Sequence, residues 1–386
     1  MQSTAATLDH AAAPDWAAIV AVTLGVTTFT VAQGLTYPLL SLVMESRAVP
    51  DALIGLNAGA FAAGIAVSTL AVRRLTALAS GDRLIIASLL VASLCLATFA
   101  VSESFLVWTA SRFVLGFAVS VIHMMSEAWL HAAVPDRLRG RVTGVYGGCM
   151  CAGFAAGPLA IPLFGTESGF AFAMVAVYVA LVGFLTALLT RRTRTRPAPA
   201  PGGALLLFSR QAPLLVAMVA AFGFADITAI AVMPVYFVKT GHSDAFAAVS
   251  VTAMALSTAA AQPLVGLLLD RLPRKAVTAA AAALAAGSYL ALPLLDWEPG
   301  LLAVFALMGI AAFALYTCAL TLLGSQFTGG LLVAGGAAFS LAYAVGSGAG
   351  SSATAFAMDL AGAAAAPLSA GLVLAAFAAV LLLSRR

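Results

Sequence analysis

The stretch Gly266-Leu-Leu-Leu-Asp270-Arg271-Leu-Pro-Arg274-Lys275 decides how this sequence is interpreted. It joins two long apolar runs and places a glycine, an acid and three basic residues between them. A membrane protein would turn on its cytoplasmic side at such a point, because basic residues gather in cytoplasmic loops. The stretch therefore predicts a short inner loop between two membrane-crossing helices.

The composition around this loop is that of a polytopic membrane protein. Of the 386 residues, 62% are hydrophobic and 9% are charged, and the mean hydropathy is +1.06. Ordinary soluble domains carry about 25% charged residues. A protein surrounded by lipid needs fewer charges, and the alternating pattern of an outer-membrane barrel is absent from the sequence.

The apolar runs predict an all-α integral membrane fold with twelve transmembrane helices. A helix needs about 20 apolar residues to cross the hydrocarbon core. Polar or turn-rich segments separate the predicted spans, which cover residues 16–44, 52–72, 83–101, 105–133, 141–164, 169–190, 213–238, 245–269, 275–294, 300–323, 330–357 and 365–383.

The basic residues predict the topology. If the amino terminus is inside, all but three of the 19 Lys and Arg lie in cytoplasmic segments; Arg47 and Lys239 are outside and Arg112 is within a span. This obeys the positive-inside rule and supports both termini being cytoplasmic. Because the cations follow topology in this way, we expect a lipid bilayer and not nucleic acid as their partner. Residues 1–15 lack the features of a cleaved signal, so we expect the first span to be retained.

The longest inner connection divides the predicted spans into two sets of six. Residues 191–212 begin Arg-Arg-Thr-Arg-Thr-Arg and continue with prolines and glycines, which disfavour a continuous helix. We therefore predict an N-terminal six-helix bundle over 1–190, a basic Pro-rich linker over 191–212 and a C-terminal six-helix bundle over 213–386. Matching elements in the two halves, such as Tyr37-Pro38 and Met233-Pro234, indicate an internal repeat.

The loop at Gly266–Lys275 resembles the signature loop of the major facilitator superfamily, which lies between the second and third helices of a six-helix half. The resemblance implies alternating-access transport by a protein that usually works as a monomer. It also implies that Asp270 latches the cytoplasmic side onto the start of span five. Arg139 and Arg141 there offer guanidinium groups and a helix amino terminus. The alternative is that Arg271, Arg274 and Lys275 only obey topology.

Glycines in span five resemble the antiporter motif of the same family. Gly144, Gly153 and Gly157-Pro158 have its spacing, although Ile161-Pro162 replaces the trailing pair of glycines. Gly346 and Gly350 repeat the shorter spacing in span eleven. Such glycines allow close helix packing, and the proline bends the helix. The motif favours export, but importers of the family carry similar glycines.

Span four carries a stripe of ionisable residues. Arg112-Phe-Val-Leu-Gly116 resembles a family motif whose arginine is linked to proton coupling. His123 lies eleven residues further on, about 20° around the helix, and Glu127 follows four residues later, so all three share one face. Since charges within a membrane usually face a cavity or a partner, this face predicts a water-accessible lining.

Each member of the stripe also has a structural interpretation. In the structural interpretation, Arg112 extends its side chain toward the membrane interface. His123 is then a packing residue whose hydrogen bonds are satisfied within the protein. Glu127 would pair with Arg137 or Arg141 near the interface.

Asp226 is the strongest candidate for binding a proton or a cationic substrate. It lies thirteen residues into span seven, near the middle of the bilayer, and its repeat mate is Thr30. A carboxyl group in a low-dielectric setting can take up and release protons; the alternative is structural hydrogen bonding. Further candidates for the lining of a central cavity, all of which also suit packing, are Gln33, Tyr37, Tyr236 and Tyr316.

The sequence shows no enzyme or metal motif. A phosphate-binding Gly-Lys-Ser/Thr loop and a Ser-His-Asp set are missing, and the four cysteines lie in apolar runs without metal-ligand spacing. We therefore expect neither an enzyme nor a cofactor or a bound metal.

The motifs together predict a multi-pass transporter of the bacterial inner membrane, with proton-coupled export of a small amphipathic or cationic compound as the leading function. Ser126-Glu-Ala-Trp129 and Arg139-Gly-Arg141 also resemble a poorly characterised bacterial branch of the family. One alternative is proton-coupled uptake of a metabolite or organic anion, in which Arg112 binds the anionic group. Another is a receptor or scaffold that does not transport. It is suggested by the matching loop of the first half, where Thr69 and Arg73 stand at the positions of the expected glycine and aspartate.

Overall fold

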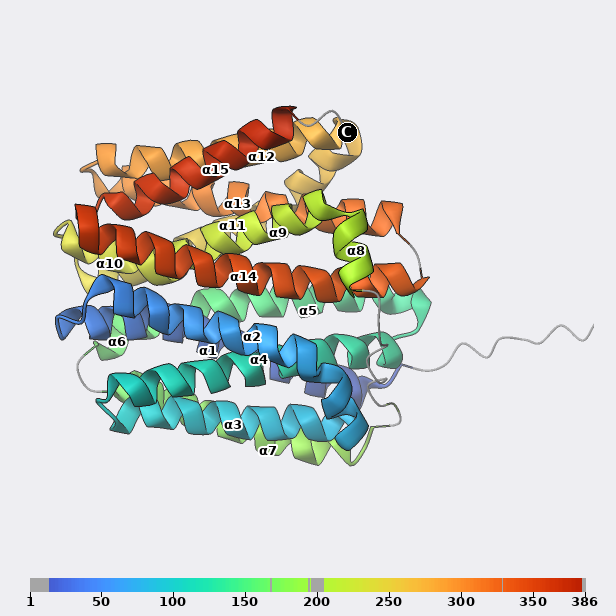
Figure 1. Cartoon of the computed structure of the whole chain (residues 1–386). Coiled ribbons are helices and arrows are strands. Elements are labelled where there is room, and N and C mark those ends of the chain that lie inside the picture. Colours follow the sequence, from blue (N-terminus) through green and yellow to red (C-terminus); the bar gives the residue numbers. More distant parts are fainter. Residues whose placement is uncertain (1–13, 167–168, 194, 196–204, 328, 384–386) are drawn as a thin grey trace, which may run out of the picture.

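The computed structural model describes residues 14–166, 169–193, 195, 205–327 and 329–383. Within these ranges the side chains of residues 131, 136–137, 139–140, 143, 329–330 and 332–333 are outside the description. Every regular element in the described part is a helix. Figure 1 shows long helices running side by side, with those of the first half of the chain (blue to green) below those of the second half (yellow to red).

The helices of the first half follow the predicted spans closely. Their bounds are α1 Trp16–Ser46, α2 Asp51–Leu78, α3 Gly81–Val101, α4 Phe105–Ala133, α5 Asp136–Ala156, α6 Ala160–Phe164 and α7 Phe170–Thr190.

The second half begins with a short helix that was not predicted. The bounds here are α8 Leu205–Gln211, α9 Pro213–Ile227, η1 Thr228–Val232, α10 Met233–Lys239, α11 Asp244–Arg271, α12 Arg274–Ala291, η2 Leu292–Leu294, α13 Glu298–Gln326, α14 Gly329–Ala361 and α15 Ala365–Leu383. In the described part, 11 helical segments are long and apolar enough to cross a membrane. The helix α14, with 33 residues, is the twelfth long helix.

Two predicted spans are interrupted. Span five breaks at Gly157-Pro158, so that α5 ends at Ala156 and α6 starts at Ala160. Proline lacks an N–H group and its ring clashes with the carbonyl four residues back, here that of Phe154. Span seven continues through a five-residue π-helix, η1, between α9 and α10.

Contacts between the halves run along the whole bundle. The helices α2 and α14 make the most extensive contact, and α5 packs on α11 and α1 on η1. Glycines allow the closest approaches: a methyl group on Gly55 of α2 would collide with the backbone of Ser351 in α14. In a membrane such small residues take the place of hydrophobic burial as the basis of helix packing.

The start of the linker is held against the first half. The Asp15 carboxylate accepts hydrogen bonds from the Thr195 backbone N–H at 2.9 Å and hydroxyl at 3.0 Å. The indole N–H of the fully buried Trp129 donates to the Thr195 carbonyl at 3.0 Å. The linker over 196–204 lies outside the described residues.

Candidate functional site

Asp226 lies at the end of α9, directly before the π-helix η1. The Tyr343 hydroxyl of α14 donates a hydrogen bond to its Oδ2 at 2.8 Å. On the neighbouring residue, the Ala225 carbonyl accepts one from Tyr289 of α12 at 2.5 Å. A π-helix is rare and occurs often at functional sites. Asp226 therefore combines an irregular backbone with a single side-chain partner.

An aromatic cluster stands beside Asp226. The Phe222 ring stacks on Tyr316 of α13, with ring centroids 5.2 Å apart. Phe313 meets Phe222 edge to face at 5.3 Å, and Tyr343 lies 5.6 Å from the same ring. Helices α9, α13 and α14 thus each contribute aromatic rings to this cluster, and the faces of such rings attract cations. Tyr316 is among the predicted cavity residues, but Phe222, Phe313 and Tyr343 are not, because an aromatic residue in an apolar span has the same local pattern as a packing residue.

Arg112 of α4 is the most deeply buried cation among the described residues, with 1% of its surface exposed. Its guanidinium lies over the Tyr37 ring at 4.3 Å and over the Phe61 ring at 5.5 Å from the centroids. Its Nε and Nη1 have no hydrogen-bond partner. This burial does not fit the snorkelling alternative. Two aromatic faces stabilise the charge in part, but donors on the guanidinium remain unused.

Tyr37 of α1 interacts with both charges. It is within electrostatic range of both Arg112 and Asp226. Its hydroxyl is buried without a hydrogen bond, although the partly exposed Gln33 lies beside it. A buried hydroxyl without a partner costs free energy. The structure thus brings Arg112, Tyr37 and Asp226 into one region between α1, α4 and α9.

His123 and Glu127 form a second group on α4. The His123 Nε2 is 3.6 Å from Glu127 Oε1, and their side chains are 35% and 53% exposed. The His123 ring meets Phe29 of α1 edge to face at 5.8 Å. Glu127 is within electrostatic range of Tyr146 and Tyr316, which belong to α5 and α13. These accessible groups lie between helices from both halves of the chain.

Tyr236 has a different set of neighbours. It is buried in α10, beyond η1, where its ring is 5.5 Å from that of Phe237. Its charged neighbour is Asp296, in the loop before α13. Tyr236 thus lies beyond the π-helix, beside Phe237 and near Asp296.

Comparisons with known proteins identify the family. A model of the Major Facilitator Superfamily matches residues 22–351. This chain belongs to the major facilitator superfamily. The superfamily match covers the helices that carry both groups described above, from α1 into α14. The protein is thus a multi-pass membrane protein of a transporter family.

Similar proteins are distant in sequence. The chain is 26% identical to the uncharacterized MFS-type transporter YfkF of Bacillus subtilis (strain 168) over 251 residues, which is 64% of each chain and so less than two thirds of that relative. The fold is similar to that of the nucleoside transporter NupG, with a TM-score of 0.73, 14% identity, and coverage of 94% of this chain and 97% of that chain. It is also similar to a bacterial homolog of the human lysosomal transporter Spinster in an inward-facing, unoccupied conformation, with a TM-score of 0.75, 15% identity, and 94% coverage of each chain.

In this structure, Asp270 of the signature loop is not engaged with a described residue of the opposite half. Asp270 and Arg271 end α11 and are exposed, and Asp270 makes neither an ion pair nor a hydrogen bond with a described residue. Arg274 donates to the Ser325 hydroxyl of α13 at 2.7 Å. Arg141 is exposed, and the side chain of Arg139 lies outside the described part. The predicted latch therefore stays a prediction for another conformation.

The glycines of the antiporter-like pattern differ in their surroundings. A methyl group on Gly153 would collide with Thr30, and one on Gly157 with the α1 backbone near Leu35. In α14, Gly346 and Gly350 abut the carbonyls of Ala220 and Phe224 of α9 in the same way. Open space surrounds Gly144 and Gly266. Pro158 lies in the break between α5 and α6.

Proposed function

We propose that this protein exports a small amphipathic or cationic compound across the bacterial inner membrane in exchange for protons. Asp226 is the group that binds the proton or the cation. Its partly exposed carboxylate next to a π-helix, with Tyr343 as its hydrogen-bonding partner, is the observation that carries the proposal. A carboxylate held within a membrane without a counter-ion is costly and usually functional.

The rings of Phe222, Phe313, Tyr316 and Tyr343 support the substrate class. They place apolar faces beside one carboxylate, which suits a ligand with a positive charge and a flat or greasy body. Proton and substrate would compete for Asp226, and this competition is the basis of exchange. The glycines of span five support the export direction.

The two predicted bundles, 1–190 and 213–386, provide the motion in this proposal. They rock about the site as a monomer and expose it to one side of the membrane at a time. Both termini lie in the cytoplasm.

Substrate-driven proton movement in proteoliposomes tests the proposal. A pH-sensitive dye is enclosed in the vesicles, and lipophilic cations, amino acids, sugars and organic acids are added in turn. We expect at least one cationic compound to move protons with the wild type but not with Asp226→Asn. The matched control is Asp296→Asn, which makes the same change at an exposed loop position. Equal proton movement with Asp226→Asn would overturn the role of Asp226, and the sign of the pH change separates exchange from symport.

Arg112 favours a second candidate function, proton-coupled uptake of an organic anion. Its buried Nε and Nη1 have no partner in the protein. A carboxylate or phosphate on the substrate would supply one, with the bidentate geometry that guanidinium groups prefer. Anion-driven proton entry that is lost in Arg112→Lys, which keeps the charge but not the fork, would select this function over export.

A further inference from the structure

Four charged residues from both halves of the chain meet at the end of the molecule opposite to α8. Lys239, in the last turn of α10, is 2.8 Å from Asp51 Oδ2 and 3.7 Å from Glu45 Oε2. Asp359 of α14 accepts hydrogen bonds from the backbone N–H groups of Asp51 at 2.9 Å and Ala52 at 2.7 Å. We call Glu45, Asp51, Lys239 and Asp359 the Asp51 clasp.

The clasp joins the halves twice, with opposite signs of charge. Lys239 of the second half pairs with acids on α1 and α2 of the first half. Asp359 of the second half covers the amino terminus of α2, which Pro50 leaves without a side-chain cap. The first N–H groups of a helix lack intrahelical partners and carry partial positive charge, so a carboxylate there is stabilising. Asp51 contributes through both its carboxylate and its N–H.

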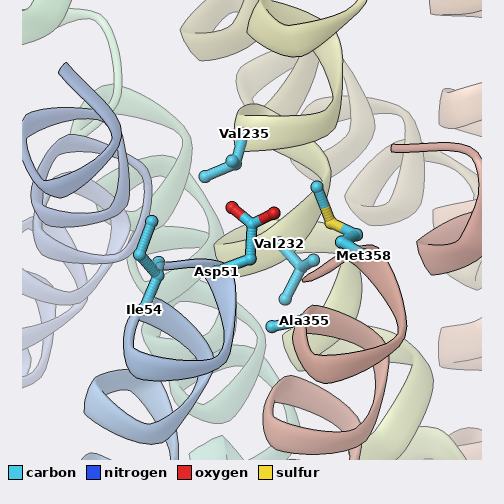
Figure 2. A pocket seen from close by; sticks show the side chains of 6 residues that line it. All are labelled: Asp51, Ile54, Val232, Val235, Ala355 and Met358. Carbon is cyan, nitrogen blue, oxygen red and sulfur yellow. The ribbon is translucent and has the colours of Figure 1, made fainter. Parts of the chain in front are cut away.

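The seam below the clasp is closed. Figure 2 shows Asp51 and Ile54 of α2 facing Val232 and Val235 from η1 and α10, with Ala355 and Met358 of α14 alongside. The gap between these six side chains has no room for a water molecule. A second seam at the same end joins α5 and α6 to α11. There Thr166 donates to Asp244 at 3.1 Å, and Thr252 to the Ala155 carbonyl at 2.9 Å.

Charged groups toward the opposite end are more exposed. Asp270 there is exposed and makes no ion pair or hydrogen bond with a described residue, and Glu127 and His123 are partly exposed. The clasp and its apolar seam thus close one end of the contact between the halves, while His123, Glu127 and Asp270 are exposed toward the other end.

We propose that the Asp51 clasp is the lock that holds this end shut, and that its ion pairs must break in each transport cycle. The inference rests on the alternating access of the proposed function. Lys239 and Asp359 are the residues that set how readily this end opens. The clasp repeats, on the other face of the membrane, the arrangement expected of Asp270, an acid placed on the helix amino terminus of the opposite half.

Site-directed labelling tests the lock without knowledge of the substrate. The reporter is Ala355→Cys, a small substitution in the closed seam that is 2% exposed, in a protein whose four cysteines are replaced by alanine. A membrane-impermeant maleimide is applied to each side of oriented vesicles. The variants are Lys239→Ala, Asp359→Asn and the exchanged pair Lys239→Asp with Asp51→Lys. The control is Glu103→Gln, which breaks the 3.3 Å pair with Arg47 at the same end but within the first half.

We expect slow labelling of the reporter in the parent protein and in Glu103→Gln, and labelling at least fivefold faster from one side in Lys239→Ala and Asp359→Asn. The variant with the exchanged pair should regain part of the reporter's protection from the maleimide. Exchanging the charges would not restore protection if the single variants were labelled faster because of a folding defect. Equal labelling rates in the clasp variants and in Glu103→Gln, with all proteins monodisperse, would overturn the proposal. Faster labelling with silent proton assays across the whole panel would leave the lock standing and count against the proposed function alone.

Discussion

Two charged side chains, Arg112 and Asp226, are held in the interior by unlike means. Arg112 rests on the rings of Tyr37 and Phe61 and leaves two nitrogens without partners, whereas Asp226 accepts one hydrogen bond from Tyr343. Removing a charged group from water costs several kcal/mol unless a partner compensates for it. Arg112 therefore keeps unused hydrogen-bond donors, Asp226 keeps capacity to accept a further hydrogen bond or a proton, and Tyr37 is within electrostatic range of both.

The Tyr343 hydroxyl is expected to be needed for proton coupling. Tyr343→Phe keeps the ring beside Phe222 but removes the donor that stabilises the charged form of Asp226. We expect substrate-driven proton movement to fall about tenfold, which corresponds to about 1.4 kcal/mol, with little change in thermal stability. The measurement is the dye assay in proteoliposomes. Tyr316→Phe makes the same change in the same aromatic cluster and should retain most of the flux; equal losses in both variants would refute a specific role for Tyr343.

The helix α14 is the element on which both the site and the clasp depend. It carries Tyr343 beside Asp226 and Asp359 at the amino terminus of α2, and it packs closely on α2 and α9. Gly346 and Gly350 of α14 allow the close approach to the backbone of α9, and Gly55 of α2 allows the close approach of α2 to the α14 backbone at Ser351. The close approach of α9 and α14 holds Asp226 and Tyr343 within hydrogen-bonding distance.

Two glycines of α14 allow a matched test of this packing. A methyl group on Gly346 would collide with the Ala220 carbonyl, while one on Gly336 meets open space. We expect Gly346→Ala to destabilise the protein by about 1–3 kcal/mol through overpacking. Gly336→Ala should be neutral or stabilising, since alanine is the better helix former. Thermal unfolding in detergent measures both, and a loss in Gly336→Ala equal to that in Gly346→Ala would show that the close approach is not the cause.

The whole molecule is asymmetric between its two ends. At the clasp end, charged and polar contacts cross between the halves, while at the Asp270 end the signature loop is exposed. Alternating access requires that the clasp end opens when the Asp270 end closes, and the reverse. The loop at Gly266–Lys275 is thus a candidate for closing the end that is open here.

Closure through Asp270 predicts a defect in turnover and not in binding. In Asp270→Asn we expect the maximal proton-coupled flux to drop several-fold, while the half-saturating substrate concentration changes less than twofold. The reason is that Asp270 is exposed, pairs with no described residue in this state and would gain its partner only on closure. Exchange of the charges in Asp270→Arg with Arg141→Asp should return flux if Arg141 is that partner. Unchanged flux in Asp270→Asn would argue against the latch.

The sequence by itself determined the helices and the family, because long apolar runs with charges sorted by loop have few stable arrangements in lipid. It also drew attention to Asp226 and Arg112, since ionisable residues within apolar spans are costly. Only the tertiary structure decided which groups meet. The pairing of Tyr343 with Asp226 and the contacts of Lys239 and Asp359 join segments far apart in the chain. Such contacts arise from helix packing, which is set by shape and small residues along whole helices and leaves no local pattern of its own.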